Sequence, residues 1–559
     1  MSVRVVTTAL AMWALATSSV LALGLQETDA QPVTAAVTGD VSSSESRIEE
    51  RALADLSAGM TAFVLSASSD DTEITFNLPP NIDTTEAWLQ LAARPASATS
   101  DGLIHVSING GDPITIHPEA RDIQARFALY SDDMQAGENT LTIGYSAQGA
   151  SAGWIVDAQR SRLRLSLDEL RPLASLAELE TTLAADFAAP RRIALITDVS
   201  RQRVTLEGLV VQGVALRAGA VPLFTGDASD ADLLIRIAEN GRLEESEVAM
   251  LHDGAPSQGP EIAFADSATP HLVITGRNID EAAAAARLFA ARSFAGYGAH
   301  FLAADAVVAE RLGRRQTRDA GRLVGADADL RTFSTSGLPF SADQGSRTAV
   351  QISAQTDSDR YGALSVLARA ALVGGEAWLY AWYGEAHHTV PPAHNLLVIG
   401  PNISGNDFVQ RNAPAEMHAA MRAAERSRGQ RGLMRFAAAA YAAEGDADRV
   451  NIGVASVFAN QDAPGTYVAA LTSPDLASFA AAGRSLGRSD LWQSLEGRAA
   501  VWSVRGVTAL DFTVASPSLQ ARVTEFANDY NRDAAFLLFG VALMMLVRGT
   551  LRRRRVHTS

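Results

Sequence analysis

The sequence predicts a mixed fold: an N-terminal antiparallel β-sandwich, two flavodoxin-like α/β domains and a single C-terminal transmembrane helix. Three observations carry this prediction. Apolar and polar residues alternate in short segments of residues 53–167, which is typical of half-buried strands. Apolar strands alternate with helices in residues 193–292 and again in 349–486, which is typical of parallel sheets with crossover helices. Residues 534–547 are uncharged and apolar, as in a membrane span.

Residues 1–30 have the pattern of a secretory signal peptide. Arg4 is the only charge before the apolar run Val5–Leu25, and small residues that suit cleavage occur at 22–24 and 28–30. An uncleaved N-terminal anchor is the alternative. Both interpretations place the body of the protein outside the cytoplasm, and the small polar residues 31–50 predict a linker.

The C-terminus predicts a membrane anchor. Residues 534–551 would form a helix of about 27 Å at 1.5 Å per residue, with Arg548 reaching to the surface. Four arginines at 552–555 predict a cytoplasmic tail, 552–559. The protein would then be a single-pass protein of a bacterial inner membrane with its body in the periplasm. A buried core helix is the alternative for this segment.

The segment before the anchor, residues 515–533, predicts an amphipathic helix lying on the bilayer. Its apolar side chains recur at spacings of four, three and four residues. A last helix packed on the second α/β domain explains the pattern equally well. The expected anchor residues of both segments are Leu519, Val523, Phe526, Tyr530, Phe536, Leu537, Leu538, Leu543 and Arg548.

Composition narrows the function classes. The chain has 559 residues, enough for several domains, and lacks cysteine, so ordinary cores must hold the exported domains. The formal net charge is -16, which argues against binding a nucleic acid or an anionic polymer by bulk charge. Aromatic residues make up only 6%, without the Trp or Tyr cluster that a dedicated glycan-binding face usually carries.

Residues 51–172 predict the sandwich. The Asn109-Gly110 pair between two alternating runs is a strong hairpin signal. The expected strands are short and no helical period separates them, which favours two packed antiparallel sheets. These strands are Thr61–Ser66, Glu73–Leu78, Ala87–Ala92, Leu103–Ile108, Ile114–Ile116, Ala125–Tyr130 and Asn139–Tyr145.

Residues 173–303 and 346–514 predict two copies of a flavodoxin-like unit, each a parallel sheet covered by helices on both faces. The segments His271–Ala290 and Tyr467–Leu486 have the same pattern of strand, capped polar turn and Ala-rich helix. In the first, Asn278 and Glu281 form a capping box. Residues 304–345 predict a linker or small subdomain, with Leu330–Ser334 as one strand.

The candidate site residues are few. His387, His388 and His394, with Glu385, are residue types that bind zinc, but they lie in a Pro-containing loop without helical ligand spacing, and an exposed loop is the favoured interpretation. The turns Thr197–Ser200 and Gln355–Asp357 follow first strands, where such folds bind ligands, but the favoured interpretation is that they simply begin helices. Arg191-Arg192 and the basic segment 313–318 could bind an anion, with solvated surface as the favoured interpretation. No catalytic motif or cofactor-binding fingerprint is present, so we expect no catalytic residue and no cofactor.

The order of several phrases resembles the periplasmic B subunit of bacterial cellulose synthase. They are residues 53–56 (LADL) leading into 63–65 (FVL), 74–79 (ITFNLP), 106–110 (VSING), 137–141 (GENTL) and 337–340 (GLPF). In that family, carbohydrate-binding-like jelly rolls alternate with flavodoxin-like domains before one membrane helix. A second jelly roll between the two α/β domains is missing here, which indicates a shortened relative.

The resemblance implies a non-catalytic accessory subunit of a cellulose or related exopolysaccharide synthase. Its partners would be the membrane-embedded glycosyltransferase, the nascent glucan and the inner membrane, with no nucleic acid; a homo-oligomer stays open. The family label of cyclic di-GMP binding conflicts with the expected topology, because that nucleotide is cytoplasmic. The alternatives are a periplasmic glycan-active enzyme or a solute-binding receptor.

Overall fold

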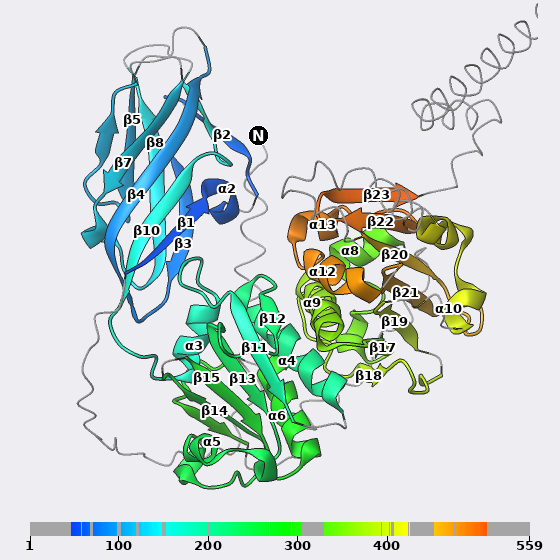
Figure 1. Ribbon diagram of the computed structural model, residues 1–559. Coiled ribbons are helices and arrows are strands. Elements are labelled where there is room, and N and C mark those ends of the chain that lie inside the picture. Colours follow the sequence, from blue (N-terminus) through cyan, green and yellow to red (C-terminus); the bar gives the residue numbers. More distant parts are fainter. Residues whose placement is uncertain are drawn as a thin grey trace, which may run out of the picture. The chain divides into compact units, whose positions relative to one another are not determined.

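The computed structural model describes residues 46–510 with gaps, the longest at 304–328 and 425–451. The described residues form four sheets: two build the N-terminal part, and each of the other two is the centre of an α/β layer (Figure 1).

The N-terminal part consists of two antiparallel sheets around one apolar core. One sheet has the strand order β1-β10-β4-β9-β2, with β7 also on β4, and the other has the order β3-β8-β5-β6. The alternating pattern produces this, because every second side chain of a strand faces the core. The elements are β1 (Arg47–Ala52), α2 (Leu53–Leu56), β2 (Ala62–Leu65), β3 (Thr72–Leu78), β4 (Ile82–Pro95), β5 (Leu103–Ile108), β6 (Ile114–Ile116), β7 (Ile123–Leu129), η1 (Ser131–Asp133), β8 (Gly137–Ser146), β9 (Trp154–Asp157) and β10 (Arg162–Glu169).

The hairpin between β5 and β6 turns at Asn109 and Gly110. Both residues have positive φ, 51° and 72°, as a tight type I′ hairpin turn requires. The Asn109 side chain also accepts a hydrogen bond from the Thr140 N–H at 2.8 Å and donates to the Asp133 carbonyl at 2.8 Å. The turn is therefore tied to β8 as well as to its own strands.

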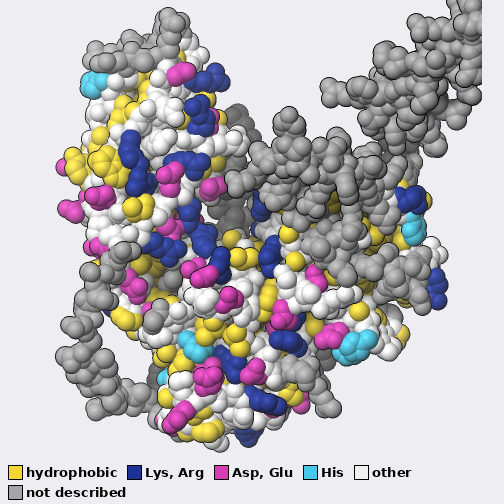
Figure 2. Space-filling model, viewed as in Figure 1, with side chains coloured by type: hydrophobic (Ala, Val, Ile, Leu, Met, Phe, Trp, Pro, Cys, Tyr) yellow, Lys and Arg dark blue, Asp and Glu magenta, His cyan; other side chains and the backbone are white. Residues whose placement is uncertain are grey.

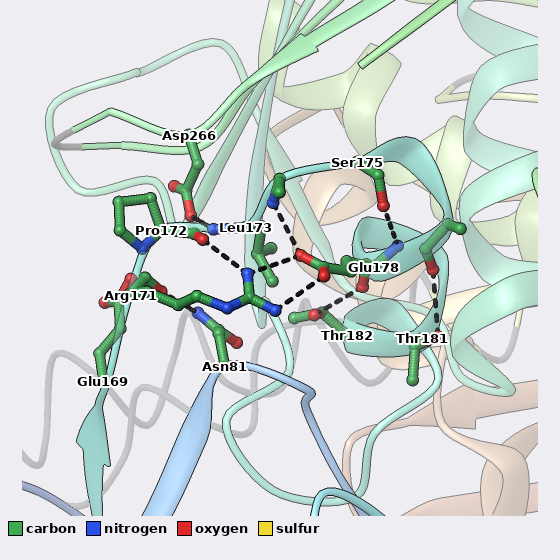
Figure 3. Close-up of polar contacts among 12 residues, drawn as sticks. Asn81, Glu169, Arg171, Pro172, Leu173, Ser175, Glu178, Thr181, Thr182 and Asp266 are labelled. Atoms are coloured by element: carbon green, nitrogen blue, oxygen red, sulfur yellow. Dashed lines mark hydrogen bonds and ion pairs between the residues drawn. The ribbon is translucent and has the colours of Figure 1, made fainter. Parts of the chain in front are cut away.

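Side chains of the sandwich and of the first α/β part hold the connector that follows β10 (Figure 3). The Asn81 amide donates to the Arg171 carbonyl at 3.1 Å. The Arg171 guanidinium makes two parallel bonds to Glu178, at 2.9 and 2.7 Å, and the Asp266 carboxylate accepts the Leu173 N–H. Such bidentate pairs fix geometry as well as charge.

Two carboxyl groups beside this connector have raised pKa values. Burial raises the pKa of Glu169, and repulsion from Asp266 adds to it, while a hydrogen bond from Asn81 acts against the rise. Burial likewise raises the pKa of Asp266 against the lowering effect of the Leu173 N–H.

The first α/β sheet has the order β12-β11-β13-β15-β14-β16. Its buried apolar strands pack against helices α4 and α6. The elements are α3 (Leu176–Leu183), β11 (Arg192–Thr197), α4 (Arg203–Ala218), β12 (Leu223–Thr225), β13 (Leu233–Ile237), η2 (Asn240–Arg242), α5 (Glu245–Ala249), η3 (His252–Gly254), β14 (Glu261–Ala265), β15 (His271–Thr275), α6 (Ile279–Ala291) and β16 (His300–Leu302).

The second α/β sheet has the order β18-β17-β19-β21-β20-β22-β23. Its central strands β17 and β19 are buried, and side chains of one face share a core with α9 and α12. The elements are α8 (Leu330–Ser336), η4 (Ala342–Gly345), β17 (Thr348–Ile352), α9 (Asp357–Gly374), β18 (Trp382–Glu385), β19 (Asn395–Ile399), α10 (Asp407–Asn412), β20 (Ile452–Ala459), β21 (Tyr467–Thr472), α12 (Leu476–Ser485), α13 (Ser489–Gln493), β22 (Ala499–Ser503) and β23 (Gly506–Leu510).

The prediction of two flavodoxin-like domains is wrong. Strand β14 runs antiparallel to β15 and β16, and β20 runs antiparallel to β21 and β22, so both sheets are mixed. The connections explain this. Only residues 266–270 join β14 to β15 and 460–466 join β20 to β21, whereas a parallel crossover needs a dozen residues or more.

The helical layer also differs from the prediction. Helix α4 of the first sheet packs against α9 of the second, and one core of buried side chains runs through α4, α6, α9 and α12. The opposite face of the first sheet carries only a small described cluster of Leu251, Ala263 and Val273. The first sheet is therefore not covered by long helices on both faces.

The strand expected at Leu330–Ser334 is a helix, α8. The Asp329 carboxylate accepts a hydrogen bond from the Thr332 N–H at 2.8 Å and caps the first turn. The short segment therefore begins a helix despite its strand-like composition.

The single-pass inner-membrane layout is also corrected. Among the residues that the structure describes, no helix has the length and apolar character needed to cross a bilayer. The segments expected to anchor the chain, 515–533 and 534–551 with all nine anchor residues, lie outside the described residues, as do the signal segment 1–30 and the tail 552–559.

Candidate functional site

A polar pocket lies where β17 and β18 end and where α9 and α4 begin. Its volume is about 210 Å³. The carboxyl ends of parallel strands are where α/β sheets usually place ligands. The pocket is lined by Arg203, Val204, Ile352, Ser353, Ala354, Gln355, Thr356, Asp357, Arg360, Glu385, Ala386 and His387.

The start of α9 shapes one wall of this pocket. The Thr356 hydroxyl accepts a hydrogen bond from the Asp359 N–H at 3.1 Å, and the Asp359 carboxylate accepts the Thr356 N–H at 3.1 Å. This reciprocal capping box fixes the first turn, so that the turn Gln355–Asp357 faces the pocket. The turn begins a helix, as the favoured interpretation predicts; that it also binds a ligand stays a prediction.

A fully buried carboxylate links the two α/β halves behind the pocket. Glu207 on α4 lies 3.2 Å from the Nε of Arg203 and 2.9 Å from the Nε of Arg360 on α9. Burial raises the pKa of Glu207, and the two guanidinium groups act against that rise. One buried carboxylate behind the pocket therefore holds Arg203 and Arg360, two of the arginines that line it.

Arg360 is held from a second side. Its guanidinium also contacts the Asp357 carboxylate at 2.5 Å. Burial acts to lower the pKa of Arg360, but attraction from Glu207 and Asp357 outweighs it and the pKa is raised. Arg360 thus stays charged at any physiological pH.

The histidine loop does not converge on one point. The His387 Nδ1 lies 3.5 Å from a Glu385 oxygen, His388 Nδ1 accepts the Glu385 N–H at 3.0 Å, and His394 Nδ1 lies 2.9 Å from the Pro392 carbonyl. Over the described part of the chain, no group of three or more potential ligands is placed to hold a metal ion.

The other predicted anion-binding positions are occupied or outside the described residues. Asp198 receives a 2.6 Å hydrogen bond from Arg236, and the Arg191 and Arg192 N–H groups bind Asp232. Residues 199–201 and the basic segment 313–318 lie outside the described part of the chain.

A second pocket lies on the outer face of the sandwich, between β2, β4, β7 and β9. Its volume is about 320 Å³. The Asp157 carboxylate accepts the N–H groups of Gln159 and Arg160 and so fixes the loop at its edge. Its lining residues are Thr61, Ala62, Ala92, Ala93, Arg94, Asp122, Ile123, Gln124, Ile155, Asp157, Gln159 and Arg160.

Sequence reasoning missed the central residues of both pockets. Arg203 and Glu207 are spaced i, i+4 on one helix, which is a recognisable ion-pair signal, but Glu207 sits within an otherwise apolar run. Arg360 comes from a distant helix, and Arg94, Gln124 and Arg160 come from three separate segments. Nothing local in the sequence brings them together.

Comparisons with known proteins do not identify a family. No family model matches the chain, and no curated protein matches it. Solved structures with partial likeness include an exo-β-1,3-galactanase from Phanerochaete chrysosporium, with 19% identity, 22% of this chain, 26% of that chain and a TM-score of 0.14. A GH26-CBM35 β-(1,4)-mannanase from Podospora anserina has 16% identity, 34% and 42% coverage and a TM-score of 0.14.

A family two carbohydrate esterase from Cellvibrio japonicus has 15% identity, 34% and 67% coverage and a TM-score of 0.14. The chain thus spans about a quarter to two fifths of the first two structures' lengths. All three are named as enzymes that act on carbohydrates. At such TM-scores the likeness carries no argument about this chain, and the geometry of its own pockets has to carry one.

Proposed function

We propose that this protein is a non-catalytic glycan-binding protein that accompanies polysaccharide synthesis. The observation that carries the proposal is the sandwich pocket. Its lining offers hydrogen-bond donors in the guanidinium groups of Arg94 and Arg160, an acceptor in the carboxylate of Asp122, and both in the amide of Gln124, whose oxygen already accepts a 3.5 Å hydrogen bond from Arg160. Sugar hydroxyls also donate and accept, so this mixture suits a carbohydrate.

An aromatic ring lies on the same face of the sheet, at some distance from the pocket. Trp88 is part-exposed on β4, with the Arg126 guanidinium 5.6 Å from its ring centre. It lies four residues from Ala92 of the pocket, roughly 13 Å at 3.3 Å per residue. The apolar face of a pyranose ring packs against an indole ring, so pocket and ring together favour an oligosaccharide over a single sugar.

The proposal that the protein acts together with a polysaccharide synthase rests on the sequence resemblance to the cellulose synthase B subunit. The partner proposed on that ground is a membrane-embedded glycosyltransferase, and the ligand is its emerging glucan or a related polymer. Co-purification of the full-length chain with such a glycosyltransferase tests this part, and a chain recovered alone under mild detergent would count against it.

Affinity electrophoresis of the full-length protein through gels containing different polysaccharides tests glycan binding. We expect retardation by at least one polymer and less retardation of a Gln124→Ala variant, with no release of reducing ends. Equal mobility in every gel would overturn the proposal. Release of new reducing ends would show a glycan-active enzyme instead.

A second candidate function is a receptor for a small polar solute, favoured by the α/β pocket. Its wall combines Arg203, Asp357 and Glu385 at a strand-end position. A screen of small solutes by thermal melting tests it. A melting shift retained in the Gln124→Ala variant would assign the binding to this pocket and not to the sandwich.

A further inference from the structure

Arginine side chains gather on the outer face of the sandwich sheet that contains β4, in a chain whose net charge is -16. Figure 2 shows basic side chains along the sandwich with acidic ones between them. We call this surface the basic face and define it by Trp88, Arg94, Arg126, Arg160, Arg162 and Arg164.

The strand register brings these side chains together. Arg164 on β10 is directly opposite Trp88 on β4, and Gln90 has Arg162 on one side and Arg126 on the other. At about 4.8 Å between strands, the Arg162 and Arg126 backbones are roughly 10 Å apart across Gln90. The neighbouring Leu163 and Leu165 point into the core, so the arginines point outward.

The guanidinium groups of this face differ in what they contact: Arg126 lies over the Trp88 ring, and Arg160 donates a hydrogen bond to the Gln124 side chain at 3.5 Å. Arg94, Arg126 and Arg164 form no ion pair with a described carboxylate, and all but Arg164 of the basic face arginines are exposed. Arg162 does pair with Glu50, at 3.3 Å.

Four carboxylates lie on or beside the same face. Glu50 is engaged by Arg162, and Asp157 is engaged by two backbone N–H groups. Glu86 on β4 and Asp122 at the pocket remain. Among the described residues, the face thus carries five guanidinium groups and four carboxylates, of which Glu50 is already paired with Arg162, and the local balance is slightly positive where the whole chain is strongly negative.

We infer that the basic face binds an acidic glycan, a polymer with carboxylate groups along its chain. This inference rests on the proposed glycan-binding function and names its ligand class. A planar guanidinium binds a carboxylate through two parallel hydrogen bonds, and Trp88 offers its ring to the sugar between two charges.

The net charge of the whole chain does not oppose such binding at physiological salt. Charges further apart than about 8 Å are largely screened there, so a polymer on the basic face responds to the local arginines. The net charge is a sum over the whole chain, and it does not describe the charge of this one face.

The test compares polygalacturonate with the same polymer after its carboxyl groups have been reduced to alcohols. Binding of the full-length protein to each is measured by calorimetry at 0.15 M salt. We expect the acidic polymer to bind more tightly. The double variant Arg126→Gln, Arg164→Gln should lower that affinity about three- to twentyfold, since each exposed ion pair contributes a few-fold.

The control variant Arg331→Gln removes one arginine charge from α8, away from this face, and should leave the affinity unchanged. Thermal melting checks that all variants fold. Equal affinity for both polymers would overturn the acidic ligand while leaving glycan binding intact. Binding to neither would also overturn the acidic ligand, and the polysaccharide gels described above would then decide whether the protein binds another glycan. Equal binding to single-stranded DNA would show a general polyanion surface and overturn the glycan assignment.

Discussion

Replacing Glu207 by alanine removes the carboxylate that joins α4 to α9. Its side chain is fully buried and contacts Arg203 at 3.2 Å and Arg360 at 2.9 Å. Removing one partner of a buried ion pair costs about 3–5 kcal/mol, because the other charge stays buried without compensation. Arg360 keeps its contact with Asp357, so we expect a loss of about 3 kcal/mol in the free energy of unfolding.

Urea unfolding followed by near-ultraviolet circular dichroism measures this loss, since buried tryptophans lie in the affected α/β core. The matched control is Arg203→Gln. Arg203 is 34% exposed, and a pair of this kind on one helix contributes about 0.3–0.5 kcal/mol. A Glu207→Ala loss below 1 kcal/mol, or one equal to that of the control, would refute the buried bridge.

Two further substitutions test other buried contacts. Burial raises the pKa of Asp266, so its contribution to stability is complete below its unfolded pKa of about 4 and is lost as pH rises through the folded pKa. Asp266→Asn should therefore be more stable relative to wild type at pH 7 than at pH 4 in denaturant titrations; a pH-independent difference would contradict this. Gln212 is fully buried and accepts the Trp378 N–H at 2.8 Å, so Gln212→Leu should lower the unfolding free energy by about 1–3 kcal/mol. An unchanged urea midpoint would show that this bond is dispensable.

Elements with local signals were predictable from the sequence. The strand at His271–Thr275 and the helix from Ile279 occur where their patterns place them. The Asn278 side chain accepts the Glu281 N–H at 3.1 Å, as the capping pattern predicts. In each case the deciding interactions lie within a few residues of the chain.

Elements decided by distant contacts were not predictable in this way. The apolar segment from Trp378 suggests a strand, but β18 begins only at Trp382, because Trp378 is buried in a turn whose backbone N–H is bound by Gln212. Strand β14 was missed, and with it the antiparallel edge that changes the sheet type.

The candidate sites show the same division. The turn Gln355–Asp357 was predictable, since it follows a buried strand and begins a helix. Its partners Arg203 and Glu207 belong to the other α/β half and meet it only through packing of α4 on α9. The basic face likewise depends on cross-strand register, which the residue pattern of one strand does not contain.

The central claim is that the outer face of the sandwich binds a glycan, and the Trp88→Ala variant tests it most directly. Calorimetry with the polymer that retards the full-length wild type most strongly should show about a tenfold loss of affinity, as expected for a central aromatic contact. Tyr130→Ala, which removes an aromatic ring that is 55% exposed elsewhere on the sandwich, should bind as wild type does. Equal affinity of the Trp88→Ala variant and wild type would contradict the claim.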